Sequence, residues 1–277
     1  MALLEHILEL RRRMTLALLA VVAGTVVGFL WFQYRVGPIP SLGSLLTEPY
    51  CRLDPQLRLN VNGSSECRLL QTQPFEAFLV RIKVGIAAGT VLTSPVWLYH
   101  VWAFITPALH RDEQKLTRIF VFCAVTLFVC GAALAYLIVP VALNALLAVG
   151  GDQFVAALAG NDYVAFVLAL LLVFGVSFEL PLFVVMLNRV GVLPYTRLRK
   201  WRRGIIFVLF AFAGLVTPGS DPFSMLGLAG ALTVLFEFAV QLARVHDRKL
   251  AGRRHDQDVL DDADATSLST QEPTCSG

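Results

Sequence analysis

The sequence predicts an all-α, polytopic membrane protein whose six transmembrane helices form a curved, cupped wall. Hydrophobic residues make up 56% of its 277 residues and charged residues only 16%, whereas soluble domains carry about 25% charged residues. The mean hydropathy is +0.67. The net charge of +3 is small and gives no indication of nucleic-acid binding, so the informative feature is where the basic residues fall.

Six apolar stretches give the helix count, because a membrane-crossing helix needs about 20 mostly apolar residues. Four are clear, at residues 15–34, 84–106, 119–141 and 163–187. Two are weaker, at residues 204–217 and 223–242, and a Pro/Gly turn joins them. The fifth rises only about 21 Å at 1.5 Å per residue. We therefore expect the short fifth and sixth helices to mark a locally thinned edge.

Prolines recur within or at the ends of these stretches, and each one frees backbone groups and bends or ends its helix. They are Pro95, Pro107, Pro140, Pro181 and Pro218. Several bent helices make a curved wall better than a straight bundle does. Pro107 and Pro140, at least, are explained by the ordinary occurrence of proline at the ends and bends of helices.

The basic residues are divided unequally between the two sides of the membrane. Of 23 Lys and Arg residues, 17 fall on one side and six in or beside a single loop on the other. This asymmetry predicts a multi-pass membrane protein with both termini in the cytoplasm. We expect a cytoplasmic amphipathic segment at residues 1–13, a membrane domain at 14–243 with a long extracytoplasmic loop at 35–75, and a polar tail at 244–277, which its composition predicts to be disordered.

Glu179 is the most informative single residue, because it lies deep inside the fourth apolar stretch. A charge at the centre of a bilayer costs about 2.5–3.5 kcal/mol on insertion scales. Two residues later, Pro181 has no N–H to give the carbonyl of Ser177 its helical partner. The acid and the freed carbonyl predict a polar notch that functions within the membrane.

The N-terminal segment reads as a short amphipathic helix with apolar residues at helical spacing. Glu9 stands four residues before Arg13, which fits either an intrahelical pair or a carboxylate offered to a basic ligand. Asp112 and Glu113, in the second loop on the basic side, are either plain solvated acids or functional ones. Glu237, near the end of the last stretch, reaches the interface or pairs with Arg244.

The cysteines fall into two groups. Cys51 and Cys67 bracket part of the outer loop, where the compartment permits a disulfide. Closing a loop of about 15 residues would stabilise the fold by roughly 3 kcal/mol in the entropic model, and we favour a bridge here. Cys123 and Cys130 lie on one face of the third stretch and read as membrane core.

Four separate sequence blocks resemble the signature stretches of the TatC family, the multispanning subunit of the twin-arginine protein translocase. They are LEHILELRRR at 4–13, SPVWLYHVWAFITPAL at 94–109, FGVSFELP at 174–181 and TPGSDPF at 217–223. The resemblance runs in order from about residue 4 to residue 241. It leaves only the tail outside.

The resemblance implies a multi-pass protein of the cytoplasmic (inner) membrane, the receptor and core of a translocase that exports folded proteins, driven by the proton-motive force. By motif, the family's signal-peptide carboxylates fall on Glu9 and Glu113, and two carboxylates suit two arginine guanidinium groups. Arg11 and Arg13 match the N-terminal motif and are expected to orient Glu9. Phe104 matches the aromatic residue next to the site.

The resemblance also assigns contacts to partners within the membrane. Glu179 matches the family's intramembrane glutamate on the concave side of the wall, which meets a partner helix or an inserted signal hairpin. Other matches lie at the short fifth helix and the outer face: Gly214, Leu215, Thr217, Pro49 and Asp221. The implied partners are TatA-like and TatB-like single-span subunits, twin-arginine signal peptides, membrane lipid and further copies of the chain. Some relatives have Gln where this chain has Met225.

Two other functional classes fit the sequence less well. A proton-coupled small-solute transporter would use Glu179 as its relay, but relays usually need several ionisable groups across the membrane, and the other stretches offer only Glu237. An enzyme is disfavoured because the sequence has no helical His pair with metal spacing, no Ser/His or Asp/Asp dyad and no Gly-rich phosphate loop. No cofactor, metal or nucleic acid is expected.

Overall fold

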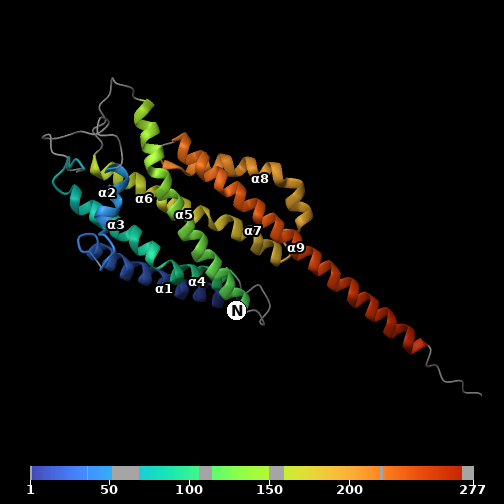
Figure 1. The fold of residues 1–277 in the computed structure, drawn as a ribbon. Helices are drawn as coiled ribbons and strands as arrows, with labels where there is room; N and C mark the ends of the chain where they lie inside the picture. Colours follow the sequence, from blue (N-terminus) through green and yellow to red (C-terminus); the bar gives the residue numbers. More distant parts are fainter. Residues whose placement is uncertain are drawn as a thin grey trace, which may run out of the picture.

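The structure is a computed structural model that describes residues 2–35, 37–51, 69–105, 114–149, 159–218 and 221–269. Within these ranges, the structure describes only the backbone of residues 2–6, 105, 114–117, 147–149 and 253–269. The described part is a helical bundle, and Figure 1 shows the helices running largely side by side, with the last one extending beyond the others. In chain order the helices are α1 (Ala2–Trp31), α2 (Leu42–Cys51), α3 (Glu76–Leu92), α4 (Ser94–Ile105), α5 (Gln114–Val149), α6 (Gly160–Ser177), α7 (Glu179–Arg189), α8 (Tyr195–Val216) and α9 (Pro222–Ser269).

The all-α membrane fold predicted from the sequence is confirmed. Within the described residues, four helical segments are long and apolar enough to cross a membrane: Ile7–Trp31, Arg118–Leu146, Gly160–Arg189 and Pro222–Gly252. The pair α3 and α4, bent by 59° at a short break, makes a fifth if it is counted as one span. The apolar half of α8 is short, so the count of six spans stays a prediction. The side of the membrane on which the termini lie also stays a prediction.

Two proline-directed breaks appear where the sequence predicts bends. Thr93, just before Pro95, separates α3 from α4, and the indole Nε1 of Trp97 donates to the carbonyl of Thr90 across this break at 2.9 Å. Phe178 separates α6 from α7 directly before Glu179. In contrast, α5 continues through Pro140 without interruption. Pro140 therefore lies inside a helix and does not end it.

Glycines let α1 and α3 pack with their backbones almost in contact. A Cβ atom added at Gly89 would lie 2.4 Å from the backbone nitrogen of Thr25, and one at Gly28 would lie 2.9 Å from the carbonyl oxygen of Gly85. Close approach through small residues is typical of helix pairs in membranes. Arg81 of α3 adds a polar link, because its Nε donates to the carbonyl of Phe29 at 3.1 Å.

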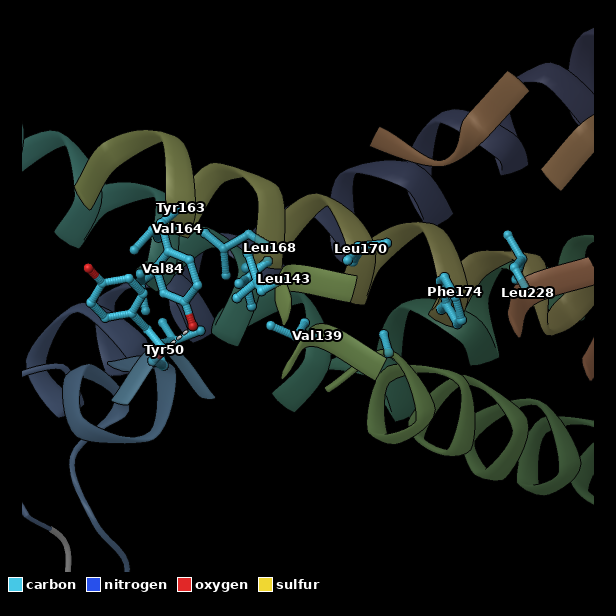
Figure 2. Packing of buried hydrophobic residues seen from close by; sticks show 14 of the residues in the cluster. Tyr50, Val84, Val139, Leu143, Tyr163, Val164, Leu168, Leu170, Phe174 and Leu228 are labelled. Carbon is cyan, nitrogen blue, oxygen red and sulfur yellow. Dashed lines mark hydrogen bonds between the residues drawn. The ribbon is translucent and has the colours of Figure 1, made fainter. Parts of the chain in front are cut away.

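The main core lies where α2, α3, α5, α6 and α9 meet, and Figure 2 shows its buried side chains. Two tyrosines fasten α2 to this core. The hydroxyl of Tyr163 donates to the carbonyl of Leu46 at 2.8 Å, and the hydroxyl of Tyr136 donates to the carbonyl of Leu45 at 2.9 Å. The Tyr163 ring also packs against Tyr50, with 5.5 Å between ring centroids. The short α2 is therefore a fixed part of the bundle.

Two regions differ from the expected segments. The N-terminal residues do not form a separate helix, because α1 runs unbroken from Ala2 to Trp31. At the other end α9 runs to Ser269, so most of the tail that its composition predicts to be disordered is helical. The segment between Pro222 and Ser269 contains no further proline, and a helix already anchored in the bundle extends without a new nucleation step.

Candidate functional site

The break at Phe178 positions Glu179 as the first residue of α7, next to an aromatic cluster. Both carboxylate oxygens are buried and accept no hydrogen bond from the described part of the chain. The side chain of Trp102 in α4 approaches the carboxylate. Its indole stacks on Phe120 of α5, with 5.9 Å between ring centroids. The result is a buried acid with unused acceptor capacity at the junction of three helices.

Glu9 and Arg13 lie on the exposed surface near the start of α1. Both Nε and a terminal nitrogen of the Arg13 guanidinium donate to the same carboxylate oxygen, Glu9 Oε1. The intrahelical pair predicted from the spacing is therefore present. The Glu9 side chain is still 44% exposed, and its Oε2 accepts no bond from the described residues. Arg11 is exposed on the same turn.

The chain brings α4 to the same end of the bundle as these residues. Figure 1 shows the N-terminal end of α1 beside the C-terminal end of α4, and the two helices contact each other. Phe104 lies partly buried in the last turn of α4. Glu113, the second predicted carboxylate, directly precedes α5 in the sequence and lies outside the described residues, as does Asp112.

The end of α8 presents the other predicted group of contact residues. Leu215 is 87% exposed, whereas Thr217 is buried and its hydroxyl donates to the carbonyl of Ala213 at 2.9 Å. A Cβ at Gly214 would lie 3.2 Å from the sulfur of Met225. Met225 thus packs on this glycine from inside the bundle, while Leu215 points away from it.

Asp221 begins the last helix. Its Oδ2 accepts the backbone N–H of Ser224 at 2.7 Å, which is the geometry of a helix N-cap. Its Oδ1 and the hydroxyl of Ser224 are buried without a hydrogen-bond partner in the described part. The acid at this turn therefore has at least a structural role.

Pro49 is buried inside α2, and Cys51 at the C-terminus of α2 is disulfide-bonded. Cys67 lies outside the described residues, so the predicted pairing of Cys51 with Cys67 stays a prediction. Cys123 and Cys130 are free thiols on α5.

Several polar contacts were not anticipated from the sequence. Glu237 pairs with Arg202 of α8 and not with Arg244 of its own helix. Glu76 accepts the backbone N–H groups of Thr72 and Asn161 at 2.6 and 2.7 Å and so joins the starts of α3 and α6. Arg202 lies 35 residues from Glu237 and Asn161 lies 85 residues from Glu76, so only tertiary packing brings these two pairs together. No cluster of three metal-binding side chains occurs within the described residues.

Comparisons with known proteins all find similarity to the same family of proteins. The family model described as Sec-independent protein translocase protein (TatC) matches residues 5–230. A Sec-independent protein translocase protein TatC from Corynebacterium kroppenstedtii is 45% identical, over 97% of this chain and 67% of the relative. The TatC protein of Aquifex aeolicus is 31% identical, over 90% of this chain and 97% of the relative.

A solved structure agrees as well. A crystal structure described as the twin arginine translocase receptor TatC superimposes with a TM-score of 0.70 at 29% identity, covering 86% of this chain and 99% of the solved chain. The match covers most of the described helices and nearly all of the other protein. The family model, the relatives and the solved fold together show that this chain belongs to the TatC family of Sec-independent protein translocase proteins.

Proposed function

We propose that this chain is the receptor for twin-arginine signal peptides and the core subunit of a translocase that exports folded proteins across the cytoplasmic membrane. The observation that carries the proposal is the arrangement of Glu9. Arg13 fixes its carboxylate through Oε1, while the Glu9 side chain stays 44% exposed and its Oε2 accepts no hydrogen bond from the described residues. A carboxylate oriented by one arginine is prepared to accept a second guanidinium from a ligand.

In this proposal Glu113 supplies the second carboxylate, so that two arginines of the signal peptide meet two acids. Phe104 contributes apolar surface beside them, and Arg11 and Arg13 orient Glu9. The N-terminal segment 1–13 is then part of the binding surface. Since a fork-shaped guanidinium pairs with a carboxylate better than an ammonium does, the site would prefer Arg-Arg over Lys-Lys. The proposal assigns no catalytic step to the chain.

Glu179 takes a different role, that of a contact within the membrane. Its two unpartnered oxygens suit a polar group on the helix of a TatA-like or TatB-like subunit, or on the inserted signal hairpin. The exposed Leu215 and its neighbours at the end of α8 offer an apolar surface for the same class of helix. Several copies of the chain and its single-span partners would form the complex that draws on the proton-motive force. The transporter alternative is not supported.

The test is the affinity of the purified chain for a twin-arginine signal peptide. We expect Glu9→Gln and Glu113→Gln each to weaken binding by about ten- to a hundredfold, because a hydrogen bond to a charged group contributes about 1.5–3 kcal/mol. Asp162→Asn is the matched control: it removes the same charge from an exposed site in the first turn of α6, at the end of the bundle where α2 lies. Wild-type affinity in both glutamate variants would remove these residues from the site.

A second measurement separates recognition from transport. Glu179→Gln is expected to reduce export in membranes far more than it reduces peptide binding. Equal losses in both assays would mean that Glu179 acts in recognition or in folding and not in partner contact.

A further inference from the structure

A cavity with a volume of about 440 Å³ lies where α8 begins, at the end of the bundle that carries most of the basic residues. Six residues line it, Leu193, Arg197, Leu198, Lys200, Trp201 and Ile205. We call this cavity the α8 groove. It is separate from Glu9, Glu179 and the exposed end of α8 around Leu215, and nothing in the proposed function uses it.

The lining divides into a charged part and an apolar part. Arg197 and Lys200 are exposed, and neither side chain has an ion-pair or hydrogen-bond partner in the described part of the chain. Leu193 and Ile205 are partly buried, and Leu198, only 1% exposed, forms the floor. Two cations without a local counter-charge thus stand above an apolar surface.

The groove has a fixed shape because its turn is held from two sides. The amide of Asn188 donates to the carbonyl of Leu193 at 3.0 Å and to Asp247 of α9 at 3.1 Å. The other oxygen of Asp247 accepts the first N–H of α8, from Tyr195, at 2.8 Å. Asp247 is thus bonded to this turn and Glu237 to Arg202, and neither pairs with Arg197 or Lys200. The groove keeps its positive charge.

The sequence of α8 indicates what kind of ligand fits. Its first half holds Arg197, Arg199, Lys200, Arg202 and Arg203, and from Gly204 onward it is apolar up to Val216. The groove straddles that boundary, and Trp201 lies at it, where tryptophan is enriched at membrane interfaces. A ligand that spans a positive surface and an apolar one within a membrane is an anionic lipid.

We propose that the α8 groove binds a single anionic phospholipid, with its phosphate between Arg197 and Lys200 and one acyl chain along Leu193, Leu198 and Ile205. Arg199 and Arg203 point to the opposite side of α8 by helical spacing and do not line the groove. They provide a matched control with the same change in charge. The lipid would fill the groove beside the cluster that joins α8 to α9.

The test uses the full chain purified in a neutral detergent and titrated with dioleoylphosphatidylglycerol, with native mass spectrometry reporting the first bound lipid. The double variant Arg197→Gln/Lys200→Gln is expected to bind at least about tenfold more weakly than wild type, as for the loss of two surface cations. Arg199→Gln/Arg203→Gln is expected to change affinity less than about twofold. The charge-conserving swap Arg197→Lys/Lys200→Arg should retain binding and confirm that the surface is intact.

Three results would overturn the proposal. Equal weakening in both Gln double variants would indicate a diffuse charge effect without a site. Equal affinity for dioleoylphosphatidylcholine would remove the role of the anionic headgroup. Displacement of the lipid by glycerol phosphate at similar concentration would show a plain phosphate site, with no contribution from the apolar half of the groove.

Discussion

Replacing Gly89 by alanine is expected to push α1 away from α3, because the new methyl group has no space. Its Cβ would lie 2.4 Å from the backbone nitrogen of Thr25, whereas ordinary van der Waals contact begins at 3.4 Å. The obstructing atoms belong to the backbone of α1, so no side-chain rotation relieves the overlap, and the helices must separate by about 1 Å. Overpacking of this kind costs about 1–3 kcal/mol.

The control for Gly89→Ala is the same substitution at Gly230 of α9, where an added Cβ would meet no atom within 4 Å. Both variants gain about 1 kcal/mol from the better helix propensity of alanine, so the difference between them isolates the packing cost. Thermal unfolding of the purified chain, followed by intrinsic fluorescence, measures it. We expect Gly89→Ala to melt roughly 3–10 °C below Gly230→Ala. Equal melting temperatures would refute the close packing of α1 on α3.

Three further predictions concern polar contacts, each checked by thermal unfolding. Tyr163→Phe removes the hydroxyl that donates to the carbonyl of Leu46, so we expect a loss of about 0.5–1.5 kcal/mol, the net contribution of one hydrogen bond; an unchanged melting temperature would mean that α2 is held without it. Asp247→Ala removes the acceptor at the start of α8 and should cost about 0.5–2 kcal/mol, as for a lost helix cap, whereas Asp247→Asn should recover part of it. Arg202→Gln breaks an exposed pair with Glu237 and should cost less than about 1 kcal/mol; a larger loss would show that this pair is shielded from solvent.

The helices themselves could be predicted from the sequence, because apolar length and proline position are local properties of the chain. The break before Glu179 follows from Pro181, and the bend between α3 and α4 occurs beside Pro95. The pairing of Glu9 with Arg13 follows from helical spacing and is observed. Each of these features depends on residues within about one turn of one another.

The contacts between distant segments could not be predicted. Glu237 has Arg244 seven residues away on its own helix, but α8 brings Arg202 closer, and only the packing of α8 on α9 decides this. Glu76 binds Asn161 across 85 residues, and the position of Gly89 against Thr25 depends on how α1 crosses α3. The helix in the tail could not be predicted because the polar composition of the tail is typical of disorder. Composition does not show that the tail continues a helix, α9, whose first half is anchored in the bundle.

In the candidate site, too, local features could be predicted from the sequence and contacts between distant segments could not. Motif resemblance assigned Glu9, Glu113 and Glu179, and the structure describes Glu9 at the surface and Glu179 with buried, unpartnered oxygens. Sequence reasoning anticipated the polar notch because Glu179 and Pro181 are neighbours. It gave no sign of the approach of Trp102, which comes from α4 and lies 77 positions earlier in the chain.

The central claim is that this chain recognises twin-arginine signal peptides beside Glu9 and Glu113. The most direct measurement is site-specific photocrosslinking from positions next to these two residues to a twin-arginine precursor in native membranes, with an otherwise identical Lys-Lys precursor for comparison. We expect crosslinks at both positions that form with Arg-Arg and fade with Lys-Lys. Crosslinks that do not depend on the arginines, or that are absent from membranes able to export the precursor, would contradict it.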